Sequence, residues 1–119
     1  PVTLNNLAWL YLELGDGRAL ETARRAQALA PDSPEVADTL GWILVRTGAL
    51  AEGLPILRRA AEASARNQDI QYHYAAALAE AGKADDARAR LKVILDGGST
   101  FESRSEAEKL LESLNKAPL

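Results

Sequence analysis

The stretch DTLGWILVRTG, residues 38–48, recurs in outline once before itself and once after itself. The anchors Leu7, Leu40 and Tyr74 each precede a small residue, and a bulky apolar residue follows each of them four positions on. A glycine stands eight positions after each anchor, at positions 15, 48 and 82. The anchors are 33 and 34 residues apart. A period of that length predicts a stack of two-helix hairpins.

Residues that break helices divide the chain into three hairpins. The predicted repeats span about residues 3–33, 34–67 and 68–98, and their helices are expected over about 3–14, 18–30, 34–47, 50–64, 67–81 and 84–95. Ser33 is the expected N-cap of the third helix, with Pro34 at its first position. Pro55 removes a backbone donor inside the fourth helix and Gly53 adds flexibility, so a kink or a late start is expected there.

A further helix is expected over about residues 100–114, after a break at residues 96–99. Its apolar residues are interspersed with glutamate, lysine, arginine and serine. A stack of hairpins leaves its last apolar face bare, and an amphipathic helix with one polar side is the usual cover. We therefore expect a capping helix, the seventh of the chain, followed by a frayed end over residues 115–119.

Composition restricts the class of protein. With 119 residues, 47% of them apolar, the chain is the size of one domain with a single core. Its net charge of -3, with both signs interspersed, leaves no basic patch for a phosphate backbone, so nucleic acid is not an expected partner. No apolar run approaches the ~20 residues needed to cross a bilayer, so no membrane insertion by this segment is expected. Because helical patterning begins directly after Pro1, we interpret the chain as a fragment of a longer repeat protein.

The repeat resembles the tetratricopeptide repeat, in which a large apolar residue precedes a small one and a second small residue lies early in the second helix. Ala19, Gly53 and Ala87 fill that second position here. Two helices that cross closely need a position on each without a bulky side chain, so Gly41 and Gly53 are expected at a tight crossing. The resemblance covers about residues 3–96. It implies an all-α fold, a right-handed α-α superhelix of three hairpins plus the capping helix.

Two strings point to a narrower resemblance. NNLAWLYLELGD and DTLGWILVRTG, followed by a cap, are similar to the end of the bacterial repeat lipoproteins found with PEP-CTERM exopolysaccharide and protein-sorting systems. That resemblance implies the cell envelope or the periplasm as the location. Without it, the expected location is the cytoplasm.

Helical spacing predicts a binding surface on the first helix of each hairpin. At about 100° per residue, a second stripe lies roughly 120° from the core stripe. In proteins that the chain resembles, this side lines a concave groove that binds ligands. The candidate partner-binding residues are Asn5, Trp9, Leu12, Asp38, Trp42, Val45, Arg46 and Tyr72. Because polar residues flank Trp9 and Trp42, each ring should keep an exposed edge. Alternatively, both rings fill gaps between neighbouring hairpins.

A well-known use of such a groove is to clamp a partner's C-terminal carboxylate with lysine, asparagine and arginine side chains. The matching positions here hold Asn5, Trp9, Thr39, Asp69 and His73. None of them is lysine or arginine. We therefore expect no carboxylate clamp.

The sequence offers no catalytic constellation. One histidine with a carboxylate one turn away does not make a metal site, and the only Gly-Lys pair lacks the rest of a phosphate-binding loop. Asp85 and Asp86 are adjacent carboxylates, but in the first turn of a helix they are expected to complement its dipole and to be solvated. No catalytic residue, cofactor or metal is expected.

Two functions remain open. The first is a protein-interaction scaffold that binds a peptide or protein partner by burying aromatic area on a pre-ordered surface. The alternative is a structural terminal segment of a longer solenoid, in which the apolar surface around Val2 and Leu4 docks onto upstream repeats. In that case the isolated chain should be a monomer or self-associate weakly through its N-terminal face.

Overall fold

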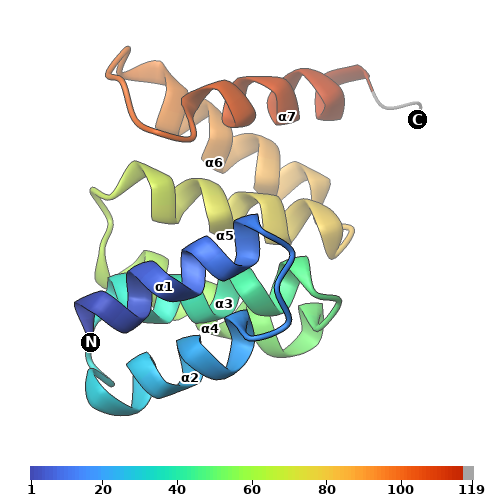
Figure 1. Cartoon of the computed structure of the whole chain (residues 1–119). Helices are drawn as coiled ribbons and strands as arrows, with labels where there is room; N and C mark the ends of the chain where they lie inside the picture. The colour runs from blue at the N-terminus through green and yellow to red at the C-terminus, as the bar shows by residue number, and fades with distance from the viewer. Residues whose placement is uncertain (117–119) are drawn as a thin grey trace.

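The computed structural model describes residues 1–116 and folds them into seven α-helices without a strand. The helices are α1 (Val2–Glu13), α2 (Ala19–Leu29), α3 (Pro34–Arg46), α4 (Leu50–Ala63), α5 (Gln68–Glu80), α6 (Ala84–Asp96) and α7 (Arg104–Lys116). Successive pairs form three stacked hairpins, and α7 lies across the last of them (Figure 1). The all-α class and the seven helices are thus confirmed. None of these helices combines the length and hydropathy needed to span a bilayer.

The first helix of every hairpin ends in the same way. Gly15, Gly48 and Gly82 have φ values of 69°, 95° and 82°. The residue after each glycine donates its backbone N–H to the carbonyl five positions earlier, in the bonds Asp16 to Tyr11 (2.8 Å), Ala49 to Leu44 (2.7 Å) and Lys83 to Leu78 (2.9 Å). This is the Schellman arrangement, which favours glycine because its left-handed backbone is strained for other residues. The recurring glycines therefore specify the same turn three times.

The first helices of the second and third hairpins also begin alike. The Ser33 side chain accepts a hydrogen bond from the Val36 backbone N–H at 3.3 Å, and Asn67 accepts one from Ile70 at 3.1 Å. Both residues satisfy a donor that the helix itself cannot. The predicted N-cap at Ser33 is confirmed.

Of the two outcomes predicted for α4, a kink or a late start, the late start is wrong and the kink stays a prediction. The helix begins at Leu50 and continues through Pro55 to Ala63. An interior proline loses one backbone hydrogen bond, whereas this helix buries Leu57 and Ala60 against its neighbours. The packing of that face keeps the helix continuous.

The boundaries of α7 also differ from the prediction. The helix begins at Arg104 rather than near residue 100, because the preceding residues form a turn in which the Arg104 N–H bonds to the Phe101 carbonyl at 3.1 Å. It continues to Lys116, so the expected fraying is wrong for residues 115 and 116. Residues 117–119 lie outside the described part of the chain.

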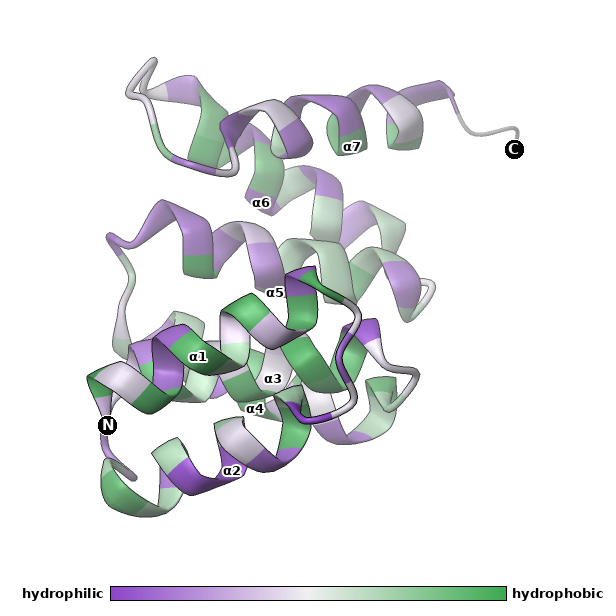
Figure 2. Ribbon diagram, in the orientation of Figure 1, coloured by the Kyte–Doolittle hydropathy of each residue, from purple (hydrophilic) through white to green (hydrophobic). Residues whose placement is uncertain are grey.

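The core is built between hairpins as well as within them. Its three buried clusters draw on helices adjacent in the stack, and the last cluster joins Ala75 and Leu91 to Ala107 of α7. The ribbon of α7 is largely hydrophilic apart from the side that faces the stack (Figure 2). A Cβ added to Gly53 would lie 2.7 Å from the Gly41 carbonyl oxygen, so the predicted tight crossing of α3 and α4 is confirmed.

Candidate partner-binding groove

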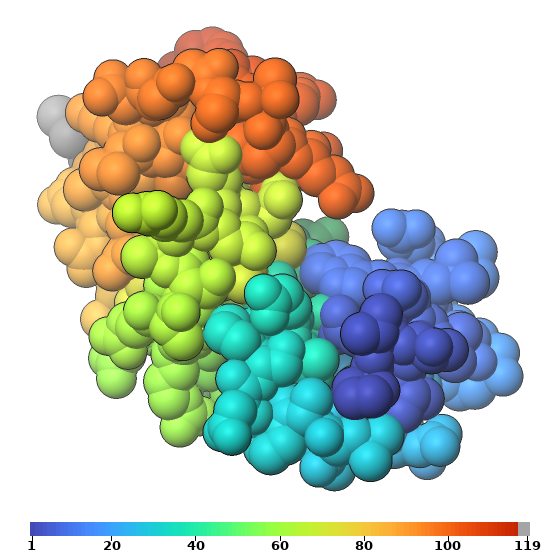
Figure 3. Space-filling model, turned by 90° about the vertical axis from the view of Figure 1, so that its left-hand side faces the viewer, coloured from blue at the N-terminus to red at the C-terminus, as the bar shows by residue number. Residues whose placement is uncertain are grey.

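A groove of about 730 Å³ follows the first helices of the three hairpins and reaches the start of α7. Its lining comes from α1, α3 and α5 and from the capping segment, including Glu102, Ser103 and Glu106. The surface is visibly hollowed between α1, in blue, and the C-terminal segment, in orange (Figure 3). Stacking of the hairpins aligns their first helices, which is why this side forms one continuous depression.

Six of the eight predicted residues line this groove: Asn5, Trp9, Asp38, Trp42, Arg46 and Tyr72. The other two do not. Val45 is 5% exposed and packs in the core, where its side chain lies beside Gly53. Leu12 packs against the buried cluster of the first two hairpins. Three residues on an α-helix turn through 300°, which leaves Val45 about 60° around the helix from Trp42. At that position its side chain meets α4 at Gly53.

The two tryptophans connect neighbouring hairpins. The Trp9 Nε1–H donates to Thr39 Oγ1 at 2.8 Å, and the Thr39 hydroxyl donates to the Glu35 carbonyl at 3.0 Å. The Trp42 ring stacks on His73, with centroids 4.5 Å apart and planes at 28°. Both tryptophans are only half-buried. The exposed edge and the gap filling, which were alternatives for these rings, are therefore both correct. Each ring fills a gap between hairpins and keeps a part of its surface exposed.

A buried polar pair lies beneath the rings. His73 Nδ1 donates to the Asp38 carboxylate, at 2.8 Å from Oδ1 and 3.0 Å from Oδ2, and both residues are less than 10% exposed. Burial raises the pKa of Asp38, the hydrogen bond from His73 opposes that rise, and the charges of Asp69 and Glu35 add to it. The pair joins α3 to α5 under the groove. The two residues are 35 positions apart and do not occupy equivalent positions of their repeats, so the repeat pattern does not mark them as a pair.

The capping segment contributes a wall that the repeat pattern did not predict. Asp69 Oδ1 accepts hydrogen bonds from the Ser103 backbone N–H at 2.8 Å and from its hydroxyl at 2.6 Å. This contact brings Glu102 and Glu106 to the groove. Burial, and then the charge of Glu106, raise the pKa of the Tyr72 hydroxyl, while Arg46 opposes that rise. No periodic signal could reveal these residues, because they follow the last repeat.

The groove is strongly acidic. Apart from Asp38, its lining includes the carboxylates Glu13, Glu35, Asp69, Glu102 and Glu106. Arg46 is its one arginine, and no lysine lines it within residues 1–116. This lining carries more negative charge than the net -3 of the whole chain. The absence of a carboxylate clamp remains a prediction that awaits a binding measurement.

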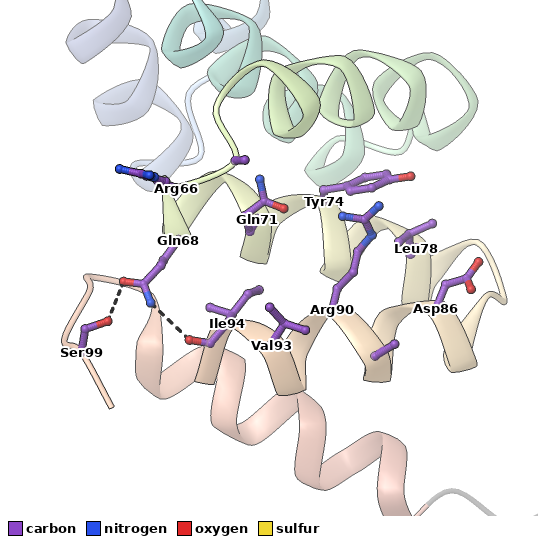
Figure 4. Close-up of a pocket in the computed structure, with 12 residues that line it drawn as sticks. Arg66, Gln68, Gln71, Tyr74, Leu78, Asp86, Arg90, Val93, Ile94 and Ser99 are labelled. Carbon is purple, nitrogen blue, oxygen red and sulfur yellow. Dashed lines mark hydrogen bonds between the residues drawn. The ribbon is translucent and has the colours of Figure 1, made fainter. Parts of the chain in front are cut away.

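A second depression, of about 790 Å³, lies on the other side of α5, against α6. Figure 4 shows Arg90 opposite Tyr74, with the guanidinium 4.6 Å from the ring centroid. Gln68 donates to the Ile94 carbonyl at 3.2 Å and accepts from the Ser99 hydroxyl at 3.0 Å. These polar groups already bind one another. We therefore take the groove, with its partly exposed aromatic rings, as the candidate site.

The other candidate chemistry of the sequence has no counterpart in the groove. Asp85 is exposed and pairs with Arg88, and Asp86 is exposed as well, so both carboxylates are solvated as predicted. Within residues 1–116, no three histidine or acidic side chains are grouped so that they could hold a metal ion.

Residues 44–98 match the family model of the tetratricopeptide repeat. The chain has a tetratricopeptide-repeat fold. Among solved structures, MamA AMB-1 has a TM-score of 0.73 at 24% identity, covering 95% of this chain and 66% of that one. A mutant form of MamA gives 0.69 at 26% identity over 95% and 64%, and MamA MSR-1 gives 0.65 at 25% over 95% and 74%.

The chain thus spans about two thirds of the length of the first solved chains that it resembles. A comparison with curated proteins found no match. The similarity to MamA therefore supports the fold, and the tetratricopeptide repeat is typically a non-catalytic interaction scaffold.

Proposed function

We propose that this chain is a scaffold that binds a peptide or protein partner in the groove, without catalytic activity. The observation that carries the proposal is the pair of partly exposed tryptophans that line the groove. Tryptophan is strongly enriched among the residues that dominate binding energy at interfaces. Two rings aligned along one depression are stronger evidence for a binding site than single exposed rings scattered over the surface.

The rings are held in place before any partner arrives. Trp9 is fixed by its hydrogen bond to Thr39, and Trp42 by stacking on His73. Side chains that are already ordered lose little conformational entropy on binding, so more of the buried area contributes to affinity. Such a site needs no cofactor.

The test is to select peptides from a random library against the chain and to measure their affinities for two variants. Trp42→Ala should weaken binding at least tenfold, whereas Leu29→Ala, a change at a 63% exposed residue of α2 away from the groove, should leave it unchanged. Because Trp42 is only half-buried, its loss should cost less stability than the ~3 to 5 kcal/mol of a fully buried large side chain. Selected peptides that bind Trp42→Ala as tightly as the wild type would refute the proposal.

A second candidate function is the structural one, favoured by the apolar surface of α1. Val2, Leu10 and Leu14 are 72%, 48% and 70% exposed, and Figure 2 shows hydrophobic stretches along this helix. In this version the chain is the terminal segment of a longer solenoid, and α1 docks onto a further repeat. The resemblance to the PEP-CTERM lipoproteins would place that solenoid in bacterial exopolysaccharide or protein-sorting machinery, at the cell envelope.

Hydrogen exchange and sedimentation test the structural alternative. If α1 normally docks onto another repeat, the isolated chain should exchange its α1 amides faster than those of α3, or should associate as concentration rises. Equally slow exchange in both helices of a strictly monomeric chain would count against it.

A further inference from the structure

We propose that the occupant of the groove is a segment of another protein that carries lysine or arginine side chains. This inference rests on the proposed function and specifies the chemistry of the partner. It is the opposite of the acidic C-terminus that a carboxylate clamp would take. The structure supports it through charge, through the placement of that charge around the aromatic floor, and through one unsatisfied acceptor.

The charge of the groove is not neutralised from within. Glu13, Glu35, Glu102 and Glu106 line it without an ion-pair partner among residues 1–116. Elsewhere, Glu52, Glu108 and Glu112 pair with a nearby arginine or lysine, whereas Glu21 and Glu62 have no ion-pair partner among residues 1–116. What distinguishes the groove is that its unpaired carboxylates gather in one depression. The groove thus concentrates negative charge in a depression, which attracts cations and repels acidic segments.

The carboxylates stand on both sides of the aromatic floor. Glu13 is at the end of α1, Glu106 is in the first turn of α7, and both line the groove. Figure 3 shows α1, in blue, and the C-terminal segment, in orange, on opposite sides of the hollow. A segment that lies between these walls passes over Trp9 and Trp42. Lysine and arginine fit both features, because their cationic ends pair with carboxylates and also bind the face of an indole ring.

Arg46 shows this chemistry within the chain itself. Its guanidinium lies 5.7 Å from the centroid of the Trp42 ring. A cation from the chain thus already rests against one groove tryptophan, whereas Trp9 has no such contact among the described residues.

An unsatisfied acceptor at the groove points to a ligand that donates hydrogen bonds. Two buried acceptors have no hydrogen-bond partner among the described residues, Asn5 Oδ1 and Gln27 Oε1, and of the two only Asn5 lines the groove. A buried polar atom without a partner is rare in folded proteins. Lysine, arginine and peptide N–H groups are all donors, and a carboxylate is not.

The experiment uses three labelled peptides of one length and one leucine and alanine framework, which differ only in carrying lysine, glutamine or glutamate at the variable positions. Binding is measured by fluorescence polarisation and by the NMR signals of the Trp9 and Trp42 indole N–H groups. The lysine peptide should shift both signals and bind more tightly than the glutamine peptide, and the glutamate peptide should bind most weakly. The affinity of the lysine peptide should fall steeply as the salt concentration is raised.

Matched variants locate the charge. The double variant Glu13→Gln with Glu106→Gln should lower the affinity for the lysine peptide by about three- to tenfold, the range expected for two exposed ion pairs. The control pair, Glu21→Gln with Glu62→Gln, removes the same charge from α2 and α4, away from the groove, and should change affinity less than twofold. Thermal unfolding of both variants confirms that they are folded.

Any other result refutes either the charge inference or the proposed binding function. If the glutamine or glutamate peptide moves the indole signals as strongly as the lysine peptide, the charge inference fails while the binding function stands. An equal loss with the control pair would mean diffuse attraction rather than a site, and the inference fails. Indole signals that move with protein concentration alone would make the occupant a second copy of the chain. If no peptide of any charge moves them, the proposed peptide-binding function fails as well.

Discussion

At the scale of single residues, Gly53 has the clearest steric role. Its missing side chain lets α4 approach the α3 backbone, since a Cβ would lie 2.7 Å from the Gly41 oxygen and 2.9 Å from the Val45 side chain. Gly53→Ala should therefore lower the free energy of unfolding by about 1 to 3 kcal/mol, the usual cost of overpacking. Urea denaturation measures it. Gly97→Ala is the control, because its φ is -73° and nothing lies within 4 Å of the added Cβ. Equal effects of the two changes would contradict the tight crossing.

Asp38 makes stability depend on pH. Burial raises its pKa in the folded state above the ordinary 3.8, with His73 opposing and Asp69 and Glu35 adding to the rise. At a pH between 3.8 and the raised pKa of the folded state, the folded protein binds more protons than the unfolded one. The free energy of unfolding therefore falls as pH rises through this range. Asp38→Asn lacks this contribution.

The measurement is urea denaturation of the wild type and Asp38→Asn from about pH 4 to about pH 7, a range that begins at the unfolded value. The advantage of the wild type over the variant should decrease as pH rises. Titration of groups that do not interact with Asp38 is common to both proteins and cancels in the difference, which leaves Asp38 and its neighbours His73, Asp69 and Glu35. A difference that stays constant, or that grows with pH, would show that the pKa of Asp38 is not raised.

At the scale of the helix, the turn glycines determine where each first helix ends. Gly48 has a φ of 95° and donates its own N–H to the Val45 carbonyl at 3.3 Å. Gly48→Ala should cost about 1 to 2 kcal/mol, because a Cβ is strained in the left-handed region. Gly17→Ala is a matched change in the turn between α1 and α2, where the φ is not positive and no atom lies near the added Cβ. It should leave the unfolding free energy within about 0.5 kcal/mol. A Gly48→Ala protein as stable as the control would refute this role.

At the scale of the whole molecule, α7 seals the open end of the stack. Ala107 is fully buried against Leu91 and Ile94, whereas Ser105 on the same helix is exposed. Ala107→Asp should detach α7 or lower the unfolding free energy by about 3 kcal/mol or more, since an unpaired charge would be buried. Ser105→Asp adds the same charge at the surface and should have little effect. Hydrogen exchange would show faster exchange in α7 of the first variant and unchanged exchange in α3. Full protection of α7 in Ala107→Asp would mean that it is not a seal.

The repeat pattern alone determined the fold class, the six helices of the hairpins, the glycine turns and the Gly41–Gly53 crossing. The amphipathic pattern after the last repeat added the seventh helix. These features follow from local chemistry that a sequence displays, namely apolar periodicity, a backbone that only glycine adopts easily, and the absence of a side chain where helices meet. The alignment of Trp9 and Trp42 along one side also followed, because stacked units place equivalent positions in a row. Tyr72 lies on the same side at the repeat position equivalent to Asp38.

Only the tertiary structure decided which residues face the groove. It placed Val45 in the core, paired Asp38 with His73 from the next hairpin, and brought Glu102 and Glu106 from the cap beside the repeats. Each of these depends on the rotation of one hairpin against the next or on the docking of α7 through Asp69 and Ser103. Such long-range contacts are set by the packing of whole surfaces, and no short period in the chain encodes them. The acidity of the groove emerges only once these surfaces are assembled.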